Sequence, residues 1–205
     1  MNIDRGIMST DSNADTVCQQ RRRIVGTGAI ATLGALVFPA FTNEAMAAAF
    51  RAGTASAGAS RRVAFRNTHT NETFSGVYRI GNKYLPDAFD RINHVLRDHR
   101  TGEVFPIDPR VMDIIYSVHQ ITGSDTPYDV LSGYRCPKSN AGLRKASSGV
   151  AKNSLHMTGQ AIDLRLPNFS TARLRDIAKS LRAGGVGYYS RSNFVHMDSG
   201  GVRSW

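Results

Sequence analysis

Residues 154–166 read Ser-Leu-His-Met-Thr-Gly-Gln-Ala-Ile-Asp-Leu-Arg-Leu, and this stretch decides the fold because it joins a polar loop to a strand. From Ala161 to Leu166 apolar and polar residues alternate, which predicts a β-strand. Asp163 interrupts the strand between two apolar residues, where a carboxylate is costly unless it pairs, accepts hydrogen bonds or binds a metal. His156 lies at the end of the loop, seven residues earlier. The stretch therefore predicts a strand that carries a polar site.

Outward from this strand, the sequence predicts a small α+β domain in which helices pack against a small antiparallel β-sheet. Alternation over 62–79 predicts a hairpin that turns near Thr70-Asn71. Apolar residues at helical spacing predict helices over 87–100 and 109–121, and a third helix that Ser170 caps and that ends at Gly184-Gly185. The other expected elements are strands at 128–132, 187–189 and 193–198, and a polar loop over 133–154.

Polar residues also interrupt the strand Phe194-Val195-His196-Met197-Asp198. The imidazoles of His156 and His196 with the carboxylate of Asp163 make a three-ligand set that leaves the fourth position of tetrahedral zinc open. Spacing alone leaves a second interpretation open, in which a histidine and an aspartate form a hydrogen bond in the core.

The chain has 205 residues and a formal net charge of +10. Residues 1–49 carry four basic and four acidic residues, so the whole excess lies in the remainder, with 22 basic and 12 acidic residues. Such a balance favours an anionic partner. Nucleic acid and bacterial envelope polymers are both anionic, so charge alone does not choose between them.

The N-terminal segment indicates in which cellular compartment the protein acts. Arg21-Arg22-Arg23 precede a mildly apolar run over 24–41, and Ala45-Met46-Ala47-Ala48 follows as a cleavage-like pattern. Paired arginines before such a run resemble an export signal of the twin-arginine type over 1–47, which requires the twin-arginine export machinery. A retained membrane anchor is the alternative, because the run is just long enough to span.

In either case we expect the globular part to lie outside the cytoplasmic membrane, in the periplasm, behind a flexible linker over 48–61. This location argues against nucleic acid as a partner, and a cleaved signal leaves no stable membrane span. Cys18 would leave with the signal, so Cys136 would have no intrachain disulfide partner. We expect Cys136 to be a small, partly exposed thiol in a turn. A nucleophilic thiol is the alternative, but no obvious base lies nearby in the sequence.

The pattern S-x-H-x-x-G-x-A-x-D over 154–163, followed by V-H-x-D over 195–198, resembles the M15-type zinc peptidases and, within them, the murein endopeptidase branch. The similarity extends over nearly all of the mature chain, including the stretches 130–135, 149–152 and 182–189 and the final Trp205. The resemblance implies a hedgehog/D-Ala-D-Ala-peptidase-like catalytic domain over 62–205. It also implies that one zinc ion is bound by His156, Asp163 and His196.

The activity that the resemblance implies is a murein endopeptidase that cuts cross-links between peptidoglycan stem peptides, at the bond joining two diaminopimelate residues. A D,D-carboxypeptidase of the same fold and a catalytically silent peptidoglycan-binding module are the alternatives. Arg135 matches an arginine that binds substrate in related enzymes, where a guanidinium binds a carboxylate or stabilises an oxyanion. Its alternative role is a surface salt bridge. Ser154 either hydrogen-bonds substrate or stabilises the loop.

Peptide hydrolysis needs a general base that transfers a proton from water to the leaving amine. Many M15 relatives have a glutamate three residues before the last ligand, where this chain has Asn193, and lysostaphin-like enzymes have a histidine at the position of Phe194. Asp198 remains as a candidate, because residues two apart on a strand face the same side. It either acts as the base or accepts a hydrogen bond that orients His196.

Overall fold

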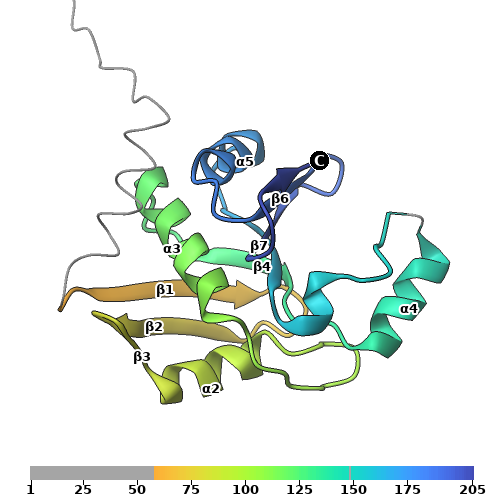
Figure 1. Cartoon of the computed structure of the whole chain (residues 1–205), viewed down its shortest axis with the longest axis horizontal. Helices are drawn as coiled ribbons and strands as arrows, with labels where there is room; N and C mark the ends of the chain where they lie inside the picture. Colours follow the sequence, from red (N-terminus) through yellow and green to blue (C-terminus); the bar gives the residue numbers. More distant parts are fainter. Residues whose placement is uncertain (1–57, 148) are drawn as a thin grey trace, which may run out of the picture. The chain divides into compact units, whose positions relative to one another are not determined.

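The computed structural model describes residues 58–147 and 149–205, which are coloured in Figure 1. The predicted export signal, Cys18 and most of the predicted linker lie outside these residues. Eight strands form one sheet in the order β3-β2-β1-β4-β5-β7-β6-β8. Their bounds are β1 Ser60–Asn67, β2 Thr73–Ile80, β3 Lys83–Tyr84, β4 Tyr128–Ser132, β5 Ala161–Arg165, β6 Gly185–Tyr189, β7 Phe194–Asp198 and β8 Arg203–Ser204.

The sheet is mixed, so the prediction of an antiparallel sheet is wrong for two strand pairs. β1 pairs with β4 in parallel, and β6 pairs with β8 in parallel. Parallel neighbours need a crossover connection. Between β1 and β4 the chain forms β2, β3 and two helices, and between β6 and β8 it forms β7, so each time it returns in its original direction. The mixed α/β composition agrees with the expectation of helices packed on a sheet.

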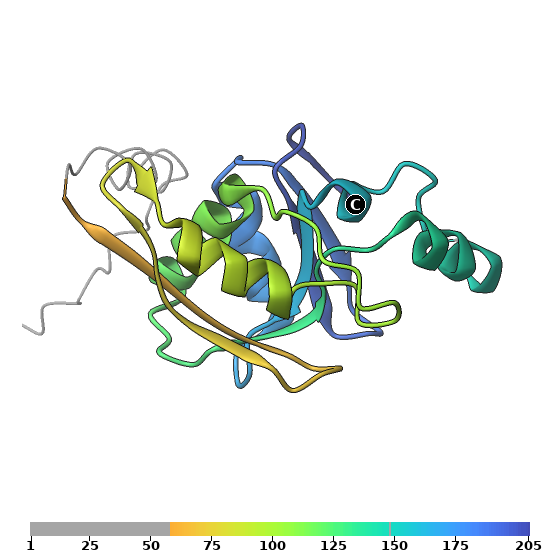
Figure 2. The same cartoon turned by 90° about the horizontal axis from the view of Figure 1, so that it is seen from below.

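Four α-helices and one short 3-10 helix complete the described domain: α2 Pro86–Val95, α3 Pro109–Thr122, α4 Pro137–Ala146, α5 Thr171–Ser180 and η1 Leu155–Thr158. α2 packs against β2, α3 against β1 and β7, and α5 against β6 and β7. Figure 2 shows α2 and α3 on one side of the long β1–β2 hairpin, and α4 at one end of the domain, away from the other helices. In the described residues no helix combines the length and apolarity that crossing a bilayer requires.

Three predicted segments differ from the structure. The helix predicted to end at Gly184-Gly185 ends at Ser180 instead, because Arg182 has a left-handed backbone (φ 49°) that a right-handed helix cannot continue through, and Gly185 already begins β6. The first predicted helix, 87–100, ends at Val95 because the chain turns there, and the buried Asp98 carboxylate accepts hydrogen bonds from the backbone N–H groups of Arg100 and Cys136. The predicted loop 133–154 contains α4. The Cys136 thiol caps one N–H group of its first turn, that of Ser139, and Pro137 occupies the first turn, where proline is well tolerated.

The core positions the site by strand alternation. Ile162 and Leu164 of β5, and Val195 and Met197 of β7, are fully buried in the core cluster. Successive side chains of a strand point to opposite faces of a sheet. The polar residues between these apolar ones therefore point to the sheet face opposite the core cluster, and a polar site follows from the same pattern that builds the core.

Candidate metal site and substrate cleft

Asp163 and His196 lie directly opposite one another on adjacent antiparallel strands. Asp163 of β5 is the register partner of His196 of β7, and both side chains are buried on the non-core face. Directly opposed residues in an antiparallel pair have neighbouring side chains. Their contact, 2.8 Å between Asp163 Oδ1 and His196 Nδ1, is thus a consequence of strand register.

His156 comes from η1, the short helix that precedes β5. Gly159 ends this helix with a left-handed backbone (φ 66°), where a Cβ would also collide with the Pro106 carbonyl group. Glycine adopts this conformation at little cost, so the chain can turn sharply from η1 into β5. The Nδ1 atom of His156 lies 2.7 Å from the carbonyl oxygen of Gly133, which fixes the orientation of the ring.

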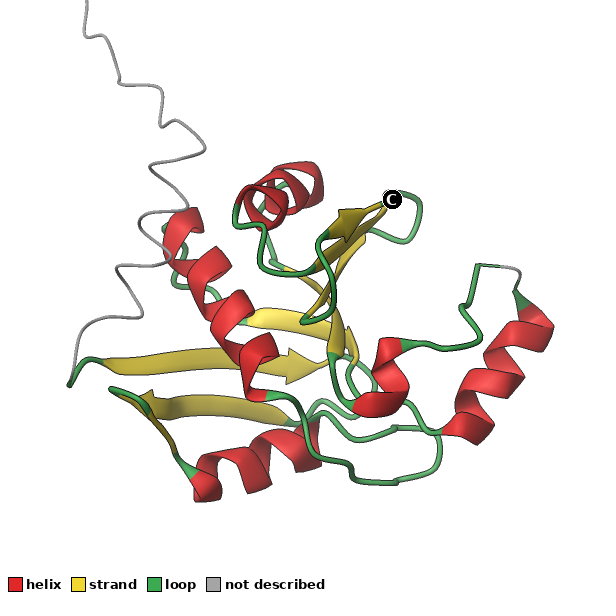
Figure 3. Cartoon of the chain, viewed as in Figure 1, coloured by secondary structure: helices red, strands yellow, loops and turns green. Residues whose placement is uncertain are grey.

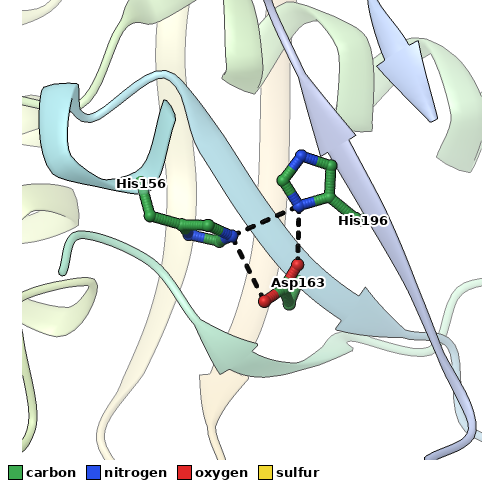
Figure 4. Close-up of side chains that lie close together, drawn as sticks. All are labelled: His156, Asp163 and His196. Carbon is green, nitrogen blue, oxygen red and sulfur yellow. Dashed lines mark hydrogen bonds and ion pairs between the residues drawn. The ribbon is translucent and has the colours of Figure 1, made fainter. Parts of the chain in front are cut away.

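The three residues converge on one point, as Figure 4 shows. His156 Nε2 lies 3.2 Å from Asp163 Oδ2 and 3.2 Å from His196 Nδ1. Among the described residues, His156, Asp163 and His196 form the one group of histidine, cysteine and acidic side chains arranged to bind a metal ion. The structure therefore brings together the three residues that the motif singled out.

The hydrogen-bond partners on the far sides of both rings assign their tautomers. His156 Nδ1 faces a carbonyl oxygen, and His196 Nε2 faces the Asp198 carboxylate at 3.0 Å, so both of these nitrogens must donate. In the neutral rings, His156 Nε2 and His196 Nδ1 then carry lone pairs that point at each other and at Asp163. Three acceptors in contact need a cation or a shared proton between them, so the donor set fits a zinc ion.

The pKa shifts of Asp163 and His196 agree with a site that fits a zinc ion. Burial raises the pKa of Asp163, but the neighbouring His156 and His196 outweigh burial and bring it well below its usual range. Burial lowers the pKa of His196, but hydrogen bonds to Asp163 and Asp198 outweigh burial and raise it to about 9. The site therefore favours positive charge, which a proton supplies when no metal is bound.

Asp198 is fully buried and its two carboxylate oxygens are occupied. Oδ2 accepts from His196 Nε2 at 3.0 Å and from an Arg203 nitrogen at 2.7 Å, and Oδ1 accepts from the backbone N–H groups of Gly185 and Gly200. The carboxylate thus contacts the nitrogen of His196 that points away from the three-residue cluster.

Arg135 follows β4 and reaches the cluster from the other side. Its side chain is 10% exposed, and one of its nitrogens lies 3.6 Å from Asp163 Oδ2. The guanidinium also donates to Ser132 and Asn140 at the long distances of 3.3 and 3.4 Å. Its Nε–H is buried and makes no hydrogen bond within the described residues. A buried guanidinium with an unused donor is a candidate for binding an anionic or carbonyl oxygen of a ligand.

A cleft of about 280 Å³ opens onto the cluster. One wall comes from the segment after α4, including Asn153 and Ser154, and the other from Tyr189, Phe194 and Trp205. Tyr189 and Phe194 belong to β6 and β7, whereas Asn153 and Ser154 lie in the loop between α4 and η1; Figure 3 colours strands yellow and loops green. Asp163 has the only side-chain carboxylate among the described residues that line the cleft.

The structure also shows the surroundings of Ser154 and Cys136, the two other residues for which the sequence predicted a role or an exposure. Ser154 is half-buried at the start of η1, lines the cleft, and its hydroxyl caps no backbone N–H there. Cys136 is 2% exposed, so the expectation of a partly exposed thiol is wrong, because the thiol is buried as the cap of α4.

Sequence reasoning missed several contributors to the site. No local sequence pattern marks the carbonyl oxygen of Gly133 or the Arg203 guanidinium, because the fold brings them to the site from other segments. The same holds for Tyr189, which lines the cleft. Tyr189 and Trp205 were part of the similarity to M15-type peptidases, but no role followed from it.

A family model of M15 peptidases, described as peptidoglycan L,D-endopeptidase MepK, matches residues 55–205. The chain therefore belongs to this peptidase family, and the resemblance inferred from its motifs is confirmed. The peptidoglycan L,D-endopeptidase MepK of Escherichia coli K12 is 38% identical over 185 residues, which cover 90% of this chain and 96% of the relative. The probable peptidoglycan L,D-endopeptidase MepK of Haemophilus influenzae is 36% identical over 190 residues, covering 92% and 97%.

Proposed function

We propose that this protein is a zinc metallo-endopeptidase that hydrolyses peptide cross-links of peptidoglycan during cell-wall growth and remodelling. The observation that carries the proposal is the convergence of three lone-pair donors, His156 Nε2, His196 Nδ1 and the Asp163 carboxylate, at the base of an open cleft. Membership of a peptidase family whose named relatives are peptidoglycan L,D-endopeptidases supports the choice of substrate.

In this proposal His156, Asp163 and His196 hold one zinc ion. Zinc, when bound, polarises a peptide carbonyl group and activates water for attack near neutral pH. The chain's own contribution is to keep both ring nitrogens unprotonated toward the metal. The Gly133 carbonyl oxygen does this for His156 by accepting its Nδ1–H, and Asp198 does it for His196 by accepting its Nε2–H.

Of the two roles considered for Asp198, we propose the orienting one. Its oxygens already accept from His196, from Arg203 and from two backbone N–H groups, and it does not line the cleft. We propose that Arg135 binds a substrate oxygen, because its side chain lines the cleft and the guanidinium holds its side-chain hydrogen bonds only at long distances. Ser154 remains a candidate substrate contact on the same cleft.

The bond that we propose for cleavage is the 3-3 cross-link between two diaminopimelate residues, as the family resemblance implies. The excess of 22 basic over 12 acidic residues after residue 49 suits an anionic wall polymer. We further propose a twin-arginine export signal over 1–47, a linker over 48–61 and the catalytic domain over 62–205, which would act in the periplasm.

Defined muropeptides test the proposal. Zinc-loaded protein is incubated with 3-3 cross-linked dimers and with monomers that end in D-Ala, and the products are separated by chromatography and mass spectrometry. Conversion of the dimers to monomers supports the endopeptidase. Release of D-Ala alone would indicate a D,D-carboxypeptidase, and binding without cleavage at full zinc occupancy would indicate a peptidoglycan-binding module.

A further inference from the structure

The C-terminal Trp205 packs directly against His196, one of the three residues of the candidate metal site. Its backbone N–H donates to the Val186 carbonyl oxygen, and a main-chain oxygen of Trp205 accepts from the Tyr188 N–H, so the residue extends the β6–β8 pairing. Figure 1 shows the C-terminus beside β6. The indole lies 5.2 Å from the His196 ring between centroids, above Gly187, the register partner of His196. A Cβ at Gly187 would be 2.6 Å from the indole, so the position needs a residue without a side chain.

The indole is also hydrogen-bonded to the last residue of β6. Trp205 Nε1–H donates to the Tyr189 hydroxyl oxygen at 3.0 Å. The Tyr189 ring stacks on Phe194 with centroids 4.5 Å apart, which fixes the plane in which the hydroxyl lies. All three aromatic residues line the cleft that contains Asp163 and His196.

The direction of this hydrogen bond determines what the Tyr189 hydroxyl can do next. A phenol has one proton to donate and accepts through its oxygen lone pairs. The indole N–H is a donor only, so it occupies a lone pair of Tyr189 and leaves the phenol proton unused. In the described residues no acceptor takes this proton. The proton is therefore available to a ligand in the cleft.

We propose that Tyr189 is a substrate-binding residue, whose hydroxyl donates a hydrogen bond to a peptide oxygen of the substrate, and that Trp205 is the residue that positions it. Arg135 lines the same cleft, so a bound peptide would meet donors from both residues. Together they would contact the polar backbone of the peptide, while the aromatic rings that line the cleft would contact its aliphatic parts. This inference rests on the proposed function, because it names a contact of the same cleft.

The primary test is Tyr189→Phe, which removes the hydroxyl and keeps the ring that stacks on Phe194. We expect kcat/KM on the cleaved muropeptide to fall by at least about fivefold, as for a lost neutral hydrogen bond. The fall would approach about 100-fold if the oxygen gains charge in the transition state. The zinc content and the midpoint temperature of thermal unfolding should stay unchanged. The matched control is Tyr84→Phe, which removes a phenol hydroxyl that binds Asp113 outside the cleft and should leave kcat/KM unchanged.

A double-mutant cycle separates substrate binding from positioning. Trp205→Phe removes the N–H donor and keeps an aromatic ring, so it should lower kcat/KM on its own. If Trp205 acts only through Tyr189, the double variant loses no more than Tyr189→Phe alone. Fully additive losses would overturn the positioning role. Because Trp205 is the only tryptophan of the chain, its emission should change in Tyr189→Phe and stay constant in Tyr84→Phe.

Failure of this inference can be distinguished from failure of the proposed function. If the wild-type protein cleaves muropeptides and Tyr189→Phe keeps its full kcat/KM, only the inference is overturned. If the wild-type protein cleaves none, the same variants are compared in calorimetric binding of a muropeptide to zinc-loaded protein. At least about fivefold weaker binding by Tyr189→Phe would then support the contact, and equal binding would overturn it.

Discussion

Replacing Asp198 with asparagine separates the two roles that this residue could have. The substitution keeps the side-chain size and exchanges one carboxylate oxygen for an NH₂ group. Asp198 Oδ2 accepts from His196 Nε2 and from Arg203, so an NH₂ group there would face two donors. The variant can relieve the conflict with His196, but not the one with Arg203, if His196 moves its proton to Nδ1, the nitrogen that faces the metal position.

A proton on Nδ1 competes with the metal, so we expect Asp198→Asn to weaken zinc binding. Loss of an acceptor behind a metal-binding histidine typically costs about 10- to 100-fold in affinity, or about 1.4 to 2.7 kcal/mol. The zinc Kd of wild-type and variant protein is measured by competition with a chromophoric chelator. The turnover of each is then measured at saturating zinc.

Asp129→Asn is the matched control, because Asp129 is also buried and paired with arginines, but lies in β4 away from the cluster. Its zinc Kd should equal that of the wild type. The orienting role would be refuted if Asp198→Asn bound zinc with wild-type affinity and yet lost turnover. That result would instead favour Asp198 as the general base.

Three further predictions concern the cluster and the fold. His156→Ala should lose zinc and turnover together, and zinc retained at one ion per chain by mass spectrometry would contradict the ligand set. Because the His196 pKa rises from 6.5 to about 9, protonated His196 stabilises the metal-free fold below pH 6.5. Urea unfolding should show that this stability is lost as pH rises to about 9, and a flat profile would refute it. Asp113→Ala removes the carboxylate that accepts hydrogen bonds from Arg79, Tyr78 and Tyr84. The free energy of unfolding, measured in urea, should fall by about 3–5 kcal/mol while the zinc affinity stays the same. A fall below about 1 kcal/mol would contradict this structural role.

Local patterns predicted those elements that local chemistry determines. The β1–β2 hairpin, β4, β5 and α3 follow from alternation, from helical periodicity and from the proline at the start of α3. α4 carries no strong apolar stripe, and its start depends on the Cys136 cap and on contacts of the folded chain. The parallel pairs β1–β4 and β6–β8 are contacts between distant segments, which no local pattern specifies.

The same distinction applies to the site. His156, Asp163 and His196 could be singled out because each is a chemically costly residue in an apolar or glycine-containing context. The groups that orient them could not be predicted, because the Gly133 carbonyl oxygen and the Arg203 guanidinium reach the site only through sheet register and tertiary packing. Backbone carbonyl groups have no sequence signature at all.

The most direct test of the zinc site is an anomalous difference map from crystals of the zinc-loaded protein, measured on both sides of the zinc absorption edge. We predict one peak, bounded by His156 Nε2, His196 Nδ1 and the Asp163 carboxylate, that appears above the edge and vanishes below it. A zinc peak elsewhere, or none at these three residues with zinc present at saturation, would contradict the assignment of the metal site.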